Sequence, residues 1–127
     1  MQRIDNTPRR LPLTETERNR TMARFTPADP VRAAEAVAAL PAAAREVAAA
    51  AANSVVALAE VPADPQAALD AYATMRRGAD AIRAAEDLLI LRLHEAGASV
   101  AGLANALSIN RLTIERRIAA AKAARNA

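Results

Sequence analysis

Apolar residues recur at helical spacing along most of this chain, and that periodicity restricts its fold more than any other feature. After Asp29, apolar side chains return every three or four residues, and no run of β-branched residues alternates as a strand would. Much of the 53% hydrophobic content is alanine, which favours helix but buries little area per residue. The sequence therefore predicts an all-α protein with a thin core, to which a second copy contributes part of the burial.

The first helical stretch is alanine-rich. Asp29 followed by a proline is a favoured helix start, because the carboxylate caps the helix and proline suits its first position. Pro41 lacks the backbone N–H that a helix interior needs. We therefore predict two helices, near residues 30–40 and 42–60.

A long helix is expected next. Asp64 and the proline after it repeat the helix-start pair, and apolar residues continue to about residue 96. Gly78 is a weak point inside this helix, and Glu86 falls where the pattern calls for an apolar residue. The remaining positions follow a near-heptad spacing that predicts a dimer interface: Ala68, Tyr72, Met75, Ala79, Ile82, Leu89 and Leu93.

Charge is divided along the chain, although the formal net charge is only +3. Residues 1–28 carry six arginines against three acids, residues 29–98 carry six arginines against ten acids, and residues 99–127 carry five cations against one glutamate. Two basic ends around an acidic middle indicate that only the ends face nucleic acid. The predicted organisation is a flexible basic arm over residues 1–28, a helical oligomerisation region over 29–86 and a DNA-binding region over 87–127.

Several other functions lack their sequence signatures. The chain has no cysteine, only three glycines and a single histidine, His94, so thiolate metal sites and glycine-rich phosphate loops are excluded. Its first residues form no apolar signal region, and the most apolar run, Val47 to Val61, is too short and alanine-rich to span a membrane. We expect a cytoplasmic, nucleoid-associated protein that is not an enzyme and uses no cofactor, metal or small-molecule ligand.

The last third of the chain has the spacing of a helix-turn-helix. Gly97 suits the left-handed residue that ends a helix, and Ser99 is an expected N-cap of the next one. Four residues form the inner stripe of that short helix: Val100, Leu103, Ala104 and Leu107. Small Ala104 would let two helices cross closely, and Ile109 would point back from the turn into the core.

The final helix divides into an inner and an outer face. Asn110 is its expected N-cap, and Ile114 and Ile118 form the side that packs inward. The opposite side carries Leu112 and Arg116, with small alanines beyond them. A recognition helix in the DNA major groove needs this arrangement, with apolar anchors behind and polar or small side chains in front.

The run from Ile90 to Ile118 resembles the three-helix DNA-binding domains of invertase/resolvase recombinases, and is similar to homeodomain-like and sigma-factor region 4 modules. The likeness covers roughly residues 87–120. It implies that Thr113 and the first turn of the last helix touch phosphates or bases, and that Arg116 reaches DNA. The chain departs from the family pattern at Ser108, where glycine is usual, and at Asn110, where serine is commoner. Ser108 fits if its backbone is not strongly left-handed.

These considerations assign the DNA contacts residue by residue. The predicted base contacts are Leu112, Thr113, Glu115 and Arg116. The predicted phosphate contacts are Ser99, Asn110, Arg111, Arg117, Lys122 and Arg125.

The function predicted from the sequence is sequence-specific binding of double-stranded DNA by a small homodimeric transcriptional regulator. Two recognition helices would enter successive major grooves, so the site should be palindromic, with half-sites about one helical turn or a multiple apart. Two alternatives stay open: a DNA packaging or partition protein with a higher oligomer, and a helical adaptor of the anti-sigma or anti-repressor type that binds protein and no DNA.

Overall fold

A computed structural model describes residues 23–127, and these residues form an all-α fold, as predicted. The arm predicted over residues 1–28 lies outside the described residues up to position 22. The helices are α2 (Pro30–Val55), η1 (a short 3-10 helix, Val56–Leu58), α3 (Pro65–Arg77), α4 (Ala79–Glu95), α5 (Val100–Leu107) and α6 (Arg111–Arg125).

Helix α2 is a single helix of 26 residues, so the prediction that Pro41 divides it was wrong. Asp29 caps its first turn by accepting from the backbone N–H groups of Val31 and Arg32, as expected. Pro41 removes one helical hydrogen bond, but its ring is exposed and alanines on both sides of it, Ala36 and Ala43, are buried. Packing on both sides of the proline therefore keeps the helix continuous.

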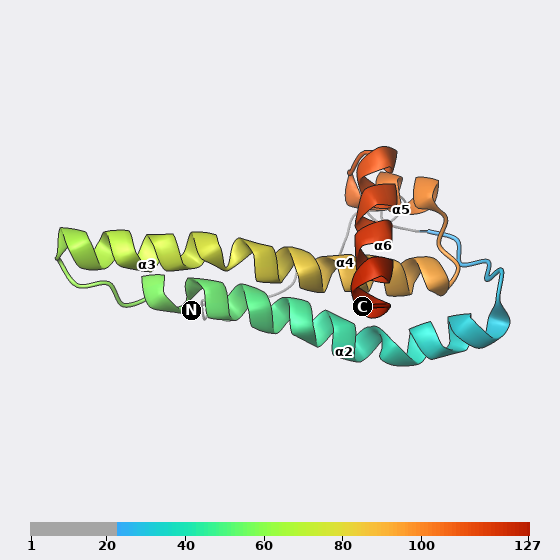
Figure 1. The fold of residues 1–127 in the computed structure, drawn as a ribbon, viewed down its shortest axis with the longest axis horizontal. Coiled ribbons are helices and arrows are strands. Elements are labelled where there is room, and N and C mark those ends of the chain that lie inside the picture. Colours follow the sequence, from blue (N-terminus) through green and yellow to red (C-terminus); the bar gives the residue numbers. More distant parts are fainter. Residues whose placement is uncertain (1–22) are drawn as a thin grey trace, which may run out of the picture.

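Helices α3 and α4 replace the single long helix that was predicted, and the boundary is Gly78. The backbone there stays right-handed, so the two helices follow one another almost in line and run back along α2 (Figure 1). A Cβ atom on Gly78 would lie 2.8 Å from the Cβ of Ser54, which is too close. Glycine at this position therefore lets α2 approach the α3–α4 line closely.

The hairpin of α2 against α3 and α4 has a core of small side chains. In α2 the buried residues are Ala33, Ala36, Ala43 and Ser54, and α3 buries none. The heptad spacing predicted that one face of the α3–α4 line contacts a second copy. Part of that face borders α2 of the same chain. Met75, Ala79 and Ile82 line a groove with Ala51 and Val55 of α2.

The larger buried side chains gather where α5 and α6 pack on the end of α4. Figure 1 shows α6 crossing α4 steeply, with α5 beside it. This cluster consists of Ile90, Leu91, Ala98, Leu103, Ala104, Ile114, Ile118 and Ala121, with Leu93, Val100 and Ile109 packed against it. A search of the described helices for one long and apolar enough to cross a membrane finds none.

Candidate functional site

The turn from α4 into α5 forms as the sequence predicted. Gly97 has φ +122°, and Ala98 N–H donates to the carbonyl of Leu93, which closes the end of α4. Ser99 then caps α5, because its Oγ accepts from the N–H of Gly102 at 2.9 Å.

Gly97 is also a contact point for the chain before α2. Thr26 N–H donates to its carbonyl at 3.1 Å, and Phe25 forms an isolated antiparallel bridge with Ala98. A Cβ atom on Gly97 would lie 2.6 Å from the Thr26 nitrogen. Glycine is therefore needed here both for the left-handed backbone and for the close approach of this segment.

Three residues, 108 to 110, join α5 to α6. Ser108 adopts φ 54° and ψ 42°, so the condition stated for a serine here, a backbone that is not strongly left-handed, is not met. The reason is the helix end itself, since Ile109 N–H donates to the Ala104 carbonyl and that bond requires a left-handed residue between them. Ser108 thus has a conformation that glycine adopts more readily than other residues.

Helix α6 is oriented as the apolar spacing predicted. Asn110 caps it by accepting from Leu112 N–H at 2.8 Å, and Ile114 and Ile118 are buried. Leu107 of α5 was expected inside, but it is 42% exposed because α5 ends there and α6 turns away.

The four predicted base-contact residues all lie away from the core or at its edge. Leu112, Glu115 and Arg116 are exposed, and Thr113 is half-buried on one flank of α6. Among the predicted phosphate contacts, Ser99 and Asn110 are exposed helix caps whose side chains already accept a backbone N–H.

The predicted cationic contacts fall into two groups. Arg117 hydrogen-bonds to Asp87 and approaches Glu86 at 3.9 Å, and its side chain is only 11% exposed. Arg125 donates to both oxygens of Glu95, at 2.8 and 3.0 Å. Three other cations, Arg111, Arg116 and Lys122, form no ion pair within residues 23–127.

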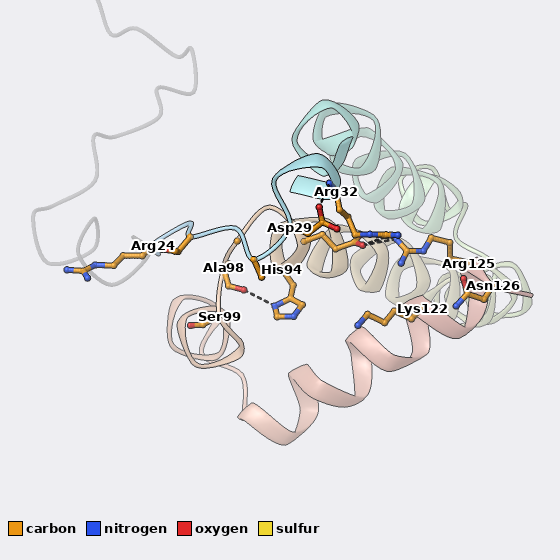
Figure 2. Close-up of a pocket in the computed structure, with 13 residues that line it drawn as sticks. Arg24, Asp29, Arg32, His94, Ala98, Ser99, Lys122, Arg125 and Asn126 are labelled. Atoms are coloured by element: carbon orange, nitrogen blue, oxygen red, sulfur yellow. Dashed lines mark hydrogen bonds and ion pairs between the residues drawn. The ribbon is translucent and has the colours of Figure 1, made fainter. Parts of the chain in front are cut away.

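Glu95 joins three helices at the edge of a shallow cleft, where Figure 2 shows its partners Arg32 and Arg125. Arg32 of α2 donates to its carboxylate at 3.1 Å, Arg125 of α6 donates from the other side, and Arg92 lies one turn before it at 3.7 Å. The Glu95 side chain is 6% exposed. Burial raises the pKa of Glu95, but the hydrogen bonds and charges of Arg125 and Arg32 outweigh it and hold the pKa below its ordinary value.

The same cleft holds His94, whose Nδ1 lies 2.8 Å from the carbonyl oxygen of Ala98. A carbonyl can only accept, so Nδ1 carries a proton and donates. Figure 2 shows the His94 ring and the Lys122 side chain facing the open side of the cleft, between the segment before α2 and the end of α6. This hydrogen bond to the α4–α5 turn was not predicted from the sequence.

Sequence reasoning missed Glu95 altogether. Its partners Arg32 and Arg125 are 63 and 30 residues away in the chain, so no local spacing indicates them. Only the pairing of Arg92 with Glu95, three residues apart, is visible from the sequence.

No cluster of three or more metal-ligating side chains occurs within residues 23–127. Comparison of the chain with protein-family models, with curated proteins and with solved structures finds no match.

Proposed function

We propose that this protein binds double-stranded DNA through α5 and α6, with α6 in the major groove. The observation that carries the proposal is the orientation of α6. Its two isoleucines are buried against α4 and α5, while Leu112 and Arg116 stand exposed on the opposite side. A short helix held rigidly from behind, with an open outer face, suits insertion into a groove.

The charge of the last two helices also supports the proposal. Residues 99–127 carry five cations and one glutamate. Arg117 and Arg125 are occupied by carboxylates of α4, so the proposal assigns no phosphate to them. Arg111, Arg116 and Lys122 remain for the nucleic acid, with Ser99 and Asn110 at the helix starts.

In this proposal Arg116 reads a base edge or a phosphate near the centre of the interface. A dimer would present two copies of α6 to successive major grooves. We propose that such a dimer acts as a transcriptional regulator. The DNA sequence should be obtained first, by selecting bound duplexes from a random pool with the purified protein. A palindromic consensus is the expected result.

Arg116→Ala should then weaken binding to the selected duplex by about 1–3 kcal/mol if it contacts a base. Fluorescence anisotropy at several salt concentrations is the measurement, because DNA binding should weaken steeply between about 50 and 200 mM salt. Arg45→Ala is the matched control, since Arg45 is exposed on α2, away from α6. Equal affinity of the two variants would remove Arg116 from the interface, and binding that ignores salt would contradict the DNA proposal as a whole.

A further inference from the structure

The far end of the hairpin, opposite α6, exposes a group of large apolar side chains. Val55 is 49% exposed, Val56 69%, Leu69 59% and Tyr72 47%. They lie near the connection between α2 and α3, and α3 buries no residue at all. Single exposed apolar side chains are ordinary, but four large ones at the same end of a hairpin indicate an interaction surface.

An apolar groove extends this group along the hairpin. It lies between α2 and the α3–α4 line, and its lining is mostly apolar: Ala51, Val55, Met75, Ala79 and Ile82, with Ser54 and Arg76 as the polar members. The Arg76 guanidinium also lies over the Tyr72 ring, 5.9 Å from its centre. Helix α2 and η1 carry no charged residue from Val47 to Ala59, so nothing on this stretch keeps another apolar surface away. We call the groove together with Val56, Leu69 and Tyr72 the tip surface.

Charges beside the tip surface are arranged in order along the chain. Three acids come first, close to the connection: Glu60, Asp64 and Asp70. Three arginines follow, about two to four turns after Asp70, with one further acid, Asp80, among them: Arg76, Arg77 and Arg83. Within residues 23–127 none of these seven charged residues forms an ion pair, whereas the acids Glu86, Asp87 and Glu95 nearer α6 all do.

An antiparallel copy of the same hairpin would complement this order. A two-fold axis near the middle of α3 sets the end of one hairpin that carries three acids against the end of the other that carries three arginines and Asp80, twice over. It also sets Tyr72 and Leu69 of each copy against apolar groups of the other. A partner of another kind would need an arginine-rich stretch opposite these acids and an acidic stretch opposite these arginines. A second copy, turned by the two-fold axis, supplies both.

We propose that the tip surface binds the tip surface of a second copy, forming an antiparallel two-fold dimer. This inference takes up the dimer of the proposed function and locates it away from α6. Its test uses no DNA, so a failure here leaves the assignment of α6 standing, and a failure of DNA binding leaves the dimer standing.

Tyr72→Glu is the first test, read out by sedimentation equilibrium of the full chain without DNA. Because Tyr72 is exposed, the variant should keep its helical circular dichroism while its dimer dissociation constant rises about tenfold or more. Val31→Glu is the matched control, since Val31 is 72% exposed at the opposite end of α2, and it should leave the constant unchanged. A wild-type chain that stays monomeric up to about 0.1 mM, or a dimer that Tyr72→Glu does not weaken, overturns the proposal.

Charge reversal gives the second test. One variant carries Glu60→Lys and Asp70→Lys, and the other carries Arg76→Glu and Arg83→Glu. In the homodimer of either variant, like charges face each other across the two-fold axis. Each variant alone should therefore dimerise about tenfold more weakly than wild type. Their equimolar mixture restores opposite charges at both contacts and should form heterodimers about as tight as the wild-type dimer. A mixture no tighter than either variant alone contradicts the antiparallel arrangement.

Discussion

The two halves of this molecule are both helical, but they bury different side chains. Every leucine and isoleucine that is buried within residues 23–127 belongs to α4, α5 or α6: Ile90, Leu91, Leu103, Ile114 and Ile118. The hairpin end buries alanines and Ser54 instead. The C-terminal unit is compact and is held together by large, closely packed side chains. In the extended hairpin the helices lie close together but bury little apolar area.

Side-chain size explains the difference. Alanine allows two helices to approach closely, as Gly78 does against Ser54, yet each buried alanine removes little apolar area from water. The hairpin must therefore gain stability from its length, from the ion pairs at its α6 end and, as proposed, from a second copy. The following substitutions test that contrast, beginning with the largest expected effect.

Ile114→Ala should destabilise the chain by about 3–4 kcal/mol, because Ile114 is fully buried and its removal leaves a cavity. Met75→Ala in the hairpin should cost less than about 1 kcal/mol, since Met75 is only half-buried beside an open groove. Urea denaturation of both variants, at a protein concentration too low for association, gives the two values. Equal losses would mean that the two halves do not differ in packing as described.

Gly97→Ala should cost about 2–3 kcal/mol, from the positive φ and from the Cβ forced against the backbone of residues 25–27. Gly102→Ala is the control within α5. Its new Cβ would meet only the Ser99 hydroxyl at 3.1 Å and the Ala23 side chain, so the change should be nearly neutral. Thermal unfolding distinguishes the two, and a well-tolerated Gly97→Ala would show that segment 25–27 does not rest on this turn.

Glu95→Gln should cost about 1–2 kcal/mol near neutral pH, because Arg32 and Arg125 lose the charge of their shared partner. The folded-state pKa of Glu95 is lowered, so its contribution is fully present above the unfolded-state value of 4.5 and is lost as pH falls through the folded value. Denaturation at a series of pH values should show the two proteins converging below about pH 4.5. A difference that stayed constant in acid would rule out the charge as its source.

Ser108→Gly should stabilise the chain by about 0.5–1 kcal/mol, the smallest effect of the series. It relieves the left-handed strain of Ser108, although the more flexible glycine offsets part of the gain. Ala106→Gly, two residues earlier and inside α5, has no strain to relieve and should cost about 1 kcal/mol. A loss of stability in both variants would argue that the turn does not hold Ser108 left-handed in solution.

The parts of the fold that could be predicted are those determined by residues close together in the sequence. Asp29, Ser99 and Asn110 cap their helices through residues two or three positions away, and Ile114 and Ile118 follow helical spacing. Predictions failed where distant segments decide the outcome. Pro41 is tolerated because α2 packs on either side of it, and Arg117 turns toward Asp87, 30 residues earlier.

For the candidate site this means that local patterns indicated which side of α6 faces outward, but not which cations lack a carboxylate partner among residues 23–127. The four proposed base contacts stay predictions, as do the phosphate contacts at Arg111 and Lys122. The sequence could not show that Arg117 and Arg125 are paired with carboxylates, because their partners lie on another helix.

The hydrogen bond from Thr26 to Gly97 has a consequence for how the chain folds. It closes a loop of about seventy residues, and the pair of Arg32 with Glu95 closes one of similar size. The contacts among α4, α5 and α6, by contrast, span some thirty residues or fewer. Since loop-closure entropy must be overcome before distant contacts form, the C-terminal unit should assemble first and α2 should dock onto it afterwards. The contact of the N-terminal segment with the α4–α5 turn should therefore be among the last contacts to form.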